Sequence, residues 1–368
     1  MSQDKILIVG GYGEVGRRLG AMLEGTRPGR VIVAGRHPKE AGLPSRHIDL
    51  EDPTSIEAAL EGVGVVVACV RQRKPNLLRA AIQRGIAYTR IAPPWIPWAD
   101  TAPLRAEAER TGAHIILAAG LEPGISSVLA RSAADRLGRI DRIETALLLS
   151  LGDTYGPDSM GFIFEEVTEP YTVTIDGRTR PALAFERSRS VNFPEPVGRA
   201  RAYSMPFRDQ LYYPATFGAK TAIAHIALDP PWLADALALA LRAGLRRFLG
   251  AGGGRERVNG WIRRLRARYA GRDRYALVVE ACGGDRVVRS TVVGRGQAEA
   301  TAAGVAAVVE ALWNGEVQVP GVWLAEQVLE PKVYLGRLAE HGIVPSIEER
   351  SMLSGPSAQK ASAQFAAH

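Results

Sequence analysis

The sequence predicts an α/β protein in which a doubly wound parallel sheet carries an inserted α+β domain. The chain has 368 residues, a length that divides into about two domains of ordinary size. Short strand-like and helix-like segments alternate over its first third, and the strands are apolar on both faces, as in a parallel sheet covered by helices. From Arg139 onward the strands become longer and more antiparallel in character, which indicates a second domain of a different kind.

The N-terminal elements follow one another closely. Strands are predicted at Lys5–Gly10, Val31–Gly35, Arg46–Leu50, Val63–Val70, Gly85–Ile91 and His114–Ala118. Helices are predicted at Glu14–Glu24, Thr54–Glu61, Pro75–Arg84 and Thr101–Thr111. We expect Thr54 to cap the second of these helices, because Glu57 follows three residues later and completes a capping box.

The middle of the chain contains longer elements. Strands are predicted at Arg142–Ser150, Tyr171–Ile175, Arg274–Ala281 and Asp285–Val293, and helices at Pro230–Leu249 and Gln297–Asn314. Asp176-Gly177 is a typical hairpin turn after the second of these strands. The last residues, Ser351–His368, are rich in Ser, Ala and Gln without periodicity and are expected to be a disordered tail.

Composition excludes several classes of protein. Hydrophobic residues make up 46% of the chain, which is too many for a disordered protein, and no run of about 18 apolar residues could span a membrane. The N-terminal stretch MSQDKILIVGG has no apolar h-region behind a basic flank, so no signal peptide is expected. Cys69 and Cys282 lie in apolar runs without metal-ligand spacing. We therefore expect a cytoplasmic protein with no metal site and no membrane partner.

The net charge of +7 at pH 7 raises the question of an anionic partner. Arginine provides 40 of the 46 basic residues, as a GC-rich coding sequence would dictate whatever the function. The most basic helix, Trp261–Tyr269, has apolar residues at helical spacing, so its arginines are interpreted as a solvated face. No nucleic-acid partner is expected.

A glycine loop between the first strand and the first helix is the strongest chemical motif. Gly10 permits a tight turn, and Gly16 allows close helix–sheet packing. Gly13 has no side chain, so the backbone N–H groups can approach a pyrophosphate closely. This GxxGxxG spacing is a variant of the dinucleotide-binding fingerprint of Rossmann domains. The predicted cofactor contacts in the loop are Gly10, Tyr12, Gly13, Glu14, Val15 and Gly16.

The end of the second strand indicates which dinucleotide binds. Arg36 and His37 stand where NAD-binding proteins place an acidic residue, and a guanidinium suits the 2′-phosphate of NADP, so NADP is predicted over NAD. Asp49, after the third strand, is placed to meet the adenine. Cys69 and Val70, after the fourth strand, are expected beside the nicotinamide.

The chain resembles the saccharopine dehydrogenase-like family in four segments. They are the glycine loop, the stretch Arg79–Tyr88, the stretch Gly112–Gly124 and the C-terminal stretch Gly315–Ile343. The G-x-x-P-G turn of the family is matched by Gly120, Pro123 and Gly124. The likeness is good over roughly the first 130 residues, moderate over the last 50 and only in outline between them.

The resemblance implies a domain organisation and an activity. Residues 1–124 and about 320–350 would form the Rossmann domain, and residues 125–319 a domain for substrate binding and dimerisation, which implies a homodimer. Family members oxidise or reduce a C–N bond in amino-acid derivatives with NAD(P)H. The small-molecule substrate would then be an amino-acid-derived imine or secondary amine.

This sequence departs from the family pattern in two places. Val70-Arg71-Gln72-Arg73-Lys74 replaces a loop that often contains Gly-Pro. Arg90 stands where members often have an acidic residue, and it either favours a substrate carboxylate or marks altered chemistry. The predicted substrate contacts are Arg90, Trp95, Glu122, Pro123 and Gly124.

Candidates for the group that moves a proton come from the inserted domain. Asp153 and Tyr155 lie in a glycine-flanked loop after a strand, and Lys220 and His225 lie in an apolar stretch where burial could shift their pKa. Structural roles are the competing interpretation for each. The sequence therefore predicts an NADP-dependent oxidoreductase acting on a C–N bond, and the alternative is an NADP-binding redox sensor without turnover.

Overall fold

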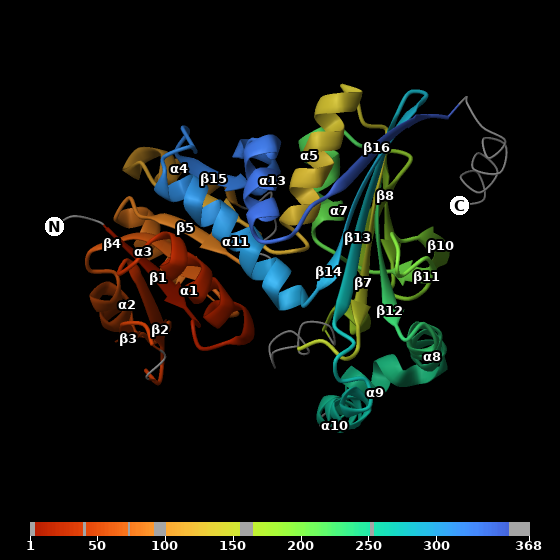
Figure 1. Ribbon diagram of the computed structural model, residues 1–368, viewed down its shortest axis with the longest axis horizontal. Coiled ribbons are helices and arrows are strands. Elements are labelled where there is room, and N and C mark those ends of the chain that lie inside the picture. The colour runs from red at the N-terminus through yellow and green to blue at the C-terminus, as the bar shows by residue number, and fades with distance from the viewer. Residues whose placement is uncertain are drawn as a thin grey trace.

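The computed structural model describes residues 4–39, 42–72, 74–91, 101–154, 165–250 and 254–352, which form two sheets with helices between and around them (Figure 1). The first sheet has seven parallel strands in the order β15-β6-β5-β4-β1-β2-β3. They are β1 (Lys5–Val9), β2 (Val31–Gly35), β3 (Ser45–His47), β4 (Val63–Ala68), β5 (Ala87–Arg90), β6 (His114–Leu117) and β15 (Gly321–Leu324). This is the predicted Rossmann order, extended by one strand from the C-terminal part of the chain.

Helices cover both faces of this sheet. They are α1 (Glu14–Thr26), α2 (Pro53–Ala59), α3 (Asn76–Gln83), α4 (Ala102–Thr111) and α11 (Gln297–Trp313). Ile6 and Ile8 of β1 belong to one apolar cluster, with α1 and α11, whereas Leu7 belongs to another, with α2, α3 and α4. Successive residues of a strand point to opposite faces, so an unbroken apolar run is what a sheet covered on both sides requires.

The second sheet is mixed and has nine strands. Its main path is β10-β11-β12-β7-β13-β14-β16, and a hairpin of β8 and β9 pairs with β12. The strands are β7 (Arg142–Ser150), β8 (Tyr171–Ile175), β9 (Arg178–Ala182), β10 (Ser188–Asn192), β11 (Arg199–Ser204), β12 (Thr221–Asp229), β13 (Arg274–Gly283), β14 (Arg286–Arg295) and β16 (Ser346–Ser351). The predicted Asp176-Gly177 turn closes the β8–β9 hairpin. Helices α5 (Ile125–Leu137) and α7 (Asp209–Phe217) cover the face turned toward the first sheet (Figure 1).

Two local predictions about helices were wrong. Asp52, not Thr54, caps α2, since its side chain accepts a hydrogen bond from the backbone N–H of Thr54 at 2.9 Å. The predicted helix Pro230–Leu249 is not continuous: α8 (Trp232–Ala240) runs through Leu241–Leu245 into α9 (Arg246–Gly250) with a kink at Gly244. Gly244 has a φ of +110°, a conformation that ends regular helix and that favours glycine.

The C-terminal part of the chain returns to the first domain and then leaves it. Helices α12 (Ala325–Val328) and α13 (Pro331–Glu340) follow β15, but β16 pairs with β14 in the second sheet. Helix α11, which precedes β15 in the chain, packs against α1. The tail predicted from residue 351 lies, from residue 353 on, outside the described residues.

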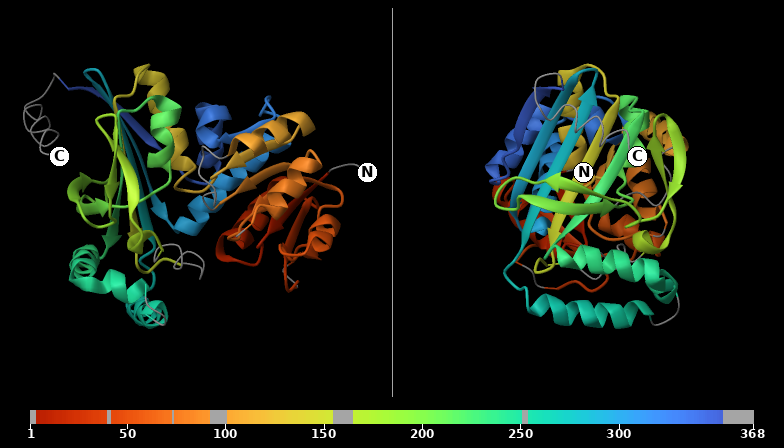
Figure 2. Two further views of the ribbon diagram at one scale, coloured as in Figure 1. Left: turned by 180° about the vertical axis from the view of Figure 1, so that it is seen from behind. Right: turned by 90° about the vertical axis from the view of Figure 1, so that its right-hand side faces the viewer.

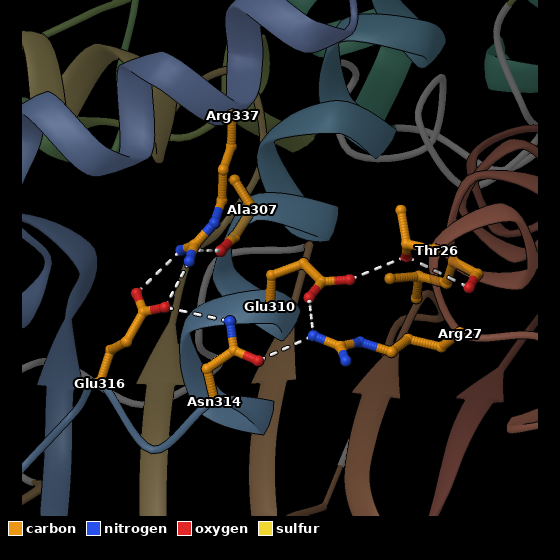
Figure 3. Close-up of polar contacts among 8 residues, drawn as sticks. Thr26, Arg27, Ala307, Glu310, Asn314, Glu316 and Arg337 are labelled. Carbon is orange, nitrogen blue, oxygen red and sulfur yellow. Dashed lines mark hydrogen bonds and ion pairs between the residues drawn. The ribbon is translucent and has the colours of Figure 1, made fainter.

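A polar network holds the returning helices to α1 and its C-terminal turn (Figure 3). Arg27 donates to Glu310 Oε2 at 2.6 Å and to Asn314 Oδ1 at 2.7 Å, and Thr26 donates to Glu310 Oε1 at 2.8 Å. Arg337 of α13 donates to Glu316 Oε2 at 2.9 Å. Each pair is partly exposed and contributes at most about 1 kcal/mol, so the network orients α11 and α13 more than it stabilises them.

Gly124, at the start of α5, provides a stability test. Its φ is +140°, and a Cβ there would lie 2.1 Å from the carbonyl oxygen of Gly120. Replacing Gly124 by alanine is expected to lower the free energy of unfolding by about 2–3 kcal/mol, measured by urea denaturation. Gly138→Ala is the control, because Gly138 also has a positive φ but open space around it, and it should cost about 1 kcal/mol. Equal losses in both variants would contradict the packing argument.

Candidate active site

The glycine loop joins β1 to α1, and Gly10, Gly11 and Gly16 in it are packed tightly. A Cβ on Gly10, whose φ is +82°, would lie 2.4 Å from a methyl carbon of Val70, and a Cβ on Gly16 would lie 2.4 Å from the carbonyl oxygen of Gly10. Gly13 is exposed, and the nearest atom to a Cβ there would be 3.4 Å away. The loop therefore closes on its inner side and stays open at Gly13, where a pyrophosphate would approach.

The N-terminus of α1 points its free backbone N–H groups into the same space. The first-turn amides of Glu14, Val15 and Gly16 have no acceptor within the helix, which is 13 residues long. The Glu14 carboxylate is directed elsewhere: it accepts hydrogen bonds from Arg17 at 2.8 Å and Arg18 at 2.7 Å, and the bond from Arg18 is the main reason why its pKa is lowered. Only the backbone of Glu14 is thus placed to meet an anion.

Tyr12 contributes the one buried polar atom of the loop that lacks a partner. Its ring lies against Gly35, 3.1 Å from where a Cβ of that glycine would stand, and its hydroxyl has no hydrogen-bond partner among the described residues. A ribose or phosphate oxygen would provide such a partner. Together with the glycine cradle and the helix N-terminus, this orphaned hydroxyl fits a dinucleotide.

The following strand ends surround the loop. Arg36 and His37, after β2, are both exposed and accessible to a ligand. Asp49 is committed to a local turn, because its Oδ1 accepts a hydrogen bond from the Glu51 N–H at 3.0 Å. Cys69 follows β4, and burial raises the pKa of its thiol to about 12, so it is a packing residue and not a nucleophile at neutral pH.

Three neighbouring strands, β5, β6 and β15, end at charged side chains. Arg90 is the last residue of β5, Glu122 lies in the turn after β6, and Glu326 lies in α12 directly after β15. Arg90 and Glu326 are buried, and Glu122 is partly exposed although its Oε1 is buried. Parallel strands bring their carboxyl ends to one edge of the sheet, which is the edge where ligands of such sheets bind.

Helix α7 of the second domain covers this edge and brings Asp209 to Glu122. Asp209 is fully buried, and its Oδ2 accepts hydrogen bonds from the hydroxyls of Tyr213 at 2.8 Å and Thr145 at 3.2 Å. Burial, and then the charge of Asp209, raise the pKa of Glu122 well above its usual range. Burial raises the pKa of Asp209 too, but the hydrogen bonds from Glu122, Tyr213 and Thr145 oppose that. We therefore assign the shared proton to Glu122 and the charge to Asp209.

Arg90 is enclosed by aromatic side chains near the same pair. Its side chain belongs to a residue that is only 2% exposed. Burial lowers the pKa of the Arg90 guanidinium, and Tyr88 and then Tyr212 partly oppose that shift. Tyr88 is itself buried and accepts a hydrogen bond from Gln72 at 2.8 Å. The arginine that departs from the family pattern thus introduces a buried positive charge at the carboxyl end of β5.

Two ion pairs lie beside this edge, and the first of them connects the domains. Arg71, in the loop after β4 that lacks Gly-Pro, contacts Glu165 at 2.6 Å, and Arg208 contacts Glu166 at 2.5 Å. Arg71 and Glu165 are both exposed, so their contact contributes little free energy. Glu166 is mostly buried, and burial raises its pKa in spite of Arg208.

The structure separates the predicted proton-transfer residues. Asp153 follows the end of β7 and its Oδ2 accepts a hydrogen bond from the Gln297 N–H at 2.7 Å, at the start of α11. Lys220 is exposed and precedes β12, which pairs in parallel with β7, so about nine residues of strand, or roughly 30 Å, lie between them. Ala224 and Ile226, on either side of His225 in β12, point toward the face covered by α7. Because successive residues of a strand point to opposite faces, His225 lies on the other face of the sheet. Tyr155 and Trp95 lie outside the described residues.

Asp209 and Glu326 have no counterpart in the sequence-based prediction. Neither belongs to a motif, and in a linear sequence each is one of 39 acidic residues. Of the predicted substrate contacts, Glu122 lies in the cluster, while Pro123 and Gly124 shape the turn that carries it. Within the described residues, no group of three or more His, Cys, Asp or Glu side chains could hold a metal ion, and no helix is long and apolar enough to cross a bilayer.

Comparisons with known proteins support the fold. No protein-family model and no curated protein matches the sequence. Apo saccharopine dehydrogenase (L-Glu forming) from Saccharomyces cerevisiae is similar over 95% of this chain and 100% of its own, at 17% identity and a TM-score of 0.70. GenD2 from gentamicin A biosynthesis, in complex with NAD, matches at 12% identity over 94% of this chain and 93% of its own, with a TM-score of 0.42. The chain therefore has a saccharopine dehydrogenase-like fold, as its resemblance to that family predicted.

Proposed function

We propose that this protein is an NADP-dependent oxidoreductase that reduces an amino-acid-derived imine, or oxidises the corresponding secondary amine, and that it acts as a homodimer. The observation that carries the proposal is the position of Glu122, beside the fully buried Asp209, at the carboxyl edge of a sheet that has a dinucleotide-type glycine loop. Reduction of a C=N bond needs a hydride on carbon and a proton on nitrogen, and few other groups from the protein.

The glycine loop would hold the cofactor. Gly10, Gly13 and Gly16, with the first amides of α1, would bind the pyrophosphate, and Arg36 with His37 would meet the ribose 2′-phosphate. When bound, the cofactor supplies or accepts the hydride. Val70, which packs against Gly10, would border the nicotinamide end.

The residues around Glu122 would control the proton. Glu122 donates its proton to the imine nitrogen, so that the N–H bond of the amine forms as the O–H bond of the carboxyl breaks. Burial, and then the charge on Asp209, raise the pKa of Glu122, which favours the protonated form that a proton donor needs. The resulting carboxylate regains a proton before the next turnover.

The test is NADPH oxidation with a panel of cyclic imines and of 2-oxo acids mixed with amines. Loss of NADPH absorbance with any member supports the proposal. Tight NADPH binding without turnover across the whole panel would favour the redox sensor instead.

The cofactor preference has its own prediction. Arg36→Ala is expected to weaken NADPH binding about 10- to 100-fold and to leave NADH binding unchanged, because only the former has the 2′-phosphate. Isothermal titration of both cofactors measures this. Arg79→Ala removes an exposed arginine of α3 and is the control. An equal loss for NADH would show that Arg36 does not distinguish the two.

A further inference from the structure

The excess of basic over acidic residues in this protein lies in one helical arm. The arm, Trp232–Arg268, comprises α8, α9 and α10 (Gly254–Ala267) and lies across one end of the second sheet (Figure 2). It contains nine arginines and two acidic residues, a net charge of +7, which equals the net charge of the whole chain. The other 331 residues hold 37 basic and 37 acidic side chains, so their net charge is zero.

The same arm exposes apolar side chains. Trp232, Phe248 and Trp261 are 46%, 41% and 53% exposed, and they are the exposed large aromatic residues of the part of the chain that the structure describes. Leu239, 70% exposed, lies two turns after Trp232 on the outer face of α8. The opposite face of α8, with Ala234 and Ala238, packs into the core. Folding therefore uses one face of the helix and leaves Trp232 and Leu239 on the outer face, beside Asp235, whose carboxylate pairs with Arg201 at 3.3 Å.

Charge and aromatic character alternate along α10. Arg257, Trp261 and Arg264 are exposed and spaced four and three residues apart, which places them in one stripe along the helix, and the exposed Arg268 follows directly after its end. Arg257, Arg264 and Arg268 form no salt bridge with any described residue. Arg246 and Arg242 attach the arm to the body by donating to backbone carbonyls, the latter to Glu186 at 3.0 Å.

We propose that the arm binds the surface of an anionic lipid bilayer. Tryptophan and leucine side chains enter the boundary between headgroups and acyl chains, while arginines beside them attract anionic headgroups. A nucleic-acid site would use the arginines but would leave Leu239 without a role. A bilayer surface accounts for both, and it requires no helix that crosses the membrane.

The test is cosedimentation of the full-length protein with vesicles of phosphatidylcholine, with or without phosphatidylglycerol. Binding should require phosphatidylglycerol and weaken with salt. The double variant Arg257→Gln/Arg264→Gln should lose about 5-fold in affinity per arginine, and Leu239→Ser about 10-fold.

Two matched controls accompany these variants. Arg178→Gln/Arg180→Gln removes the same charge from exposed positions of β9, and Val344→Ser changes a side chain that is 69% exposed outside the arm. Both should bind vesicles as the wild type does, and unchanged NADPH affinity would show that every variant is folded.

Three results would overturn the proposal. One is equal binding of the protein to vesicles with and without phosphatidylglycerol. Another is salt-sensitive binding to a single-stranded oligonucleotide that Leu239→Ser leaves unchanged, which would assign the arm to nucleic acid. The third is a dimer that Leu239→Ser dissociates in the absence of any vesicle binding, which would assign the apolar face to a second copy of the chain.

Discussion

Replacing Glu122 by glutamine is expected to reduce turnover of an imine substrate about 10²- to 10⁴-fold while NADPH binding is unchanged. Glutamine keeps the shape of the side chain but has no acidic proton to give to nitrogen. Steady-state kinetics and NADPH titration measure the two effects separately. Glu109→Gln, an exposed position on α4, is the control. Wild-type turnover in Glu122→Gln would show that the proton comes from another group.

Asp209→Asn separates a role in positioning the proton from a role in folding. The charge of Asp209 raises the pKa of Glu122, so removing that charge should lower it. Turnover requires protonated Glu122 and is lost as pH rises through its pKa. The alkaline limit of activity in the variant should therefore move to lower pH, a shift that simple loss of folded protein would not cause.

The second large effect concerns stability and comes from Glu326. Burial raises the pKa of this carboxyl from 4.5 to about 7. In the unfolded chain the Glu326 carboxyl has its ordinary pKa of 4.5. Between pH 4.5 and about 7 the folded state therefore holds a proton on Glu326 that the unfolded state has lost. This contribution is therefore present below pH 4.5 and is lost as pH rises to about 7, where the free energy of unfolding is lower by about 3 kcal/mol.

Glu326→Gln should remove this dependence. The variant is expected to be more stable than the wild type at pH 8 by about 3 kcal/mol, with a much smaller difference at pH 5. Urea denaturation at both pH values measures it, and Glu340→Gln on the exposed side of α13 is the control. If the free energy of unfolding of Glu326→Gln and of Glu340→Gln changes equally between pH 5 and pH 8, burial does not raise the pKa of Glu326.

Features that depend on neighbours in the chain were predictable from the sequence. The apolar runs of β1, β2 and β4, the glycine turn at Gly10 and the Asp176-Gly177 hairpin all follow from local backbone and periodicity rules. The failures were also local in kind. A glycine inside an apolar run kinked the helix after α8, and Asp52 competed successfully with Thr54 for the cap of α2.

The proton-transfer residues could not be chosen in the same way. Asp153 and Lys220 were both plausible in sequence, yet the parallel pairing of β7 with β12 places them at opposite ends of one sheet. Glu122 and Asp209 meet because α7 packs over the carboxyl ends of β5, β6 and β15. Burial and a neighbouring charge raise the pKa of Glu122, and both arise only in the packed structure.

The doubly wound sheet and its dinucleotide loop are thus properties of the sequence alone, because strand periodicity and glycine turns act over a few residues. The buried carboxyl cluster and the exposure of the aromatic side chains in the basic arm belong to the tertiary structure. A count of residues yields +7 for the chain. The same count places that excess in residues 232–268, but only the fold shows that three aromatic rings of this segment are exposed, because exposure is decided by which face of each helix the core covers.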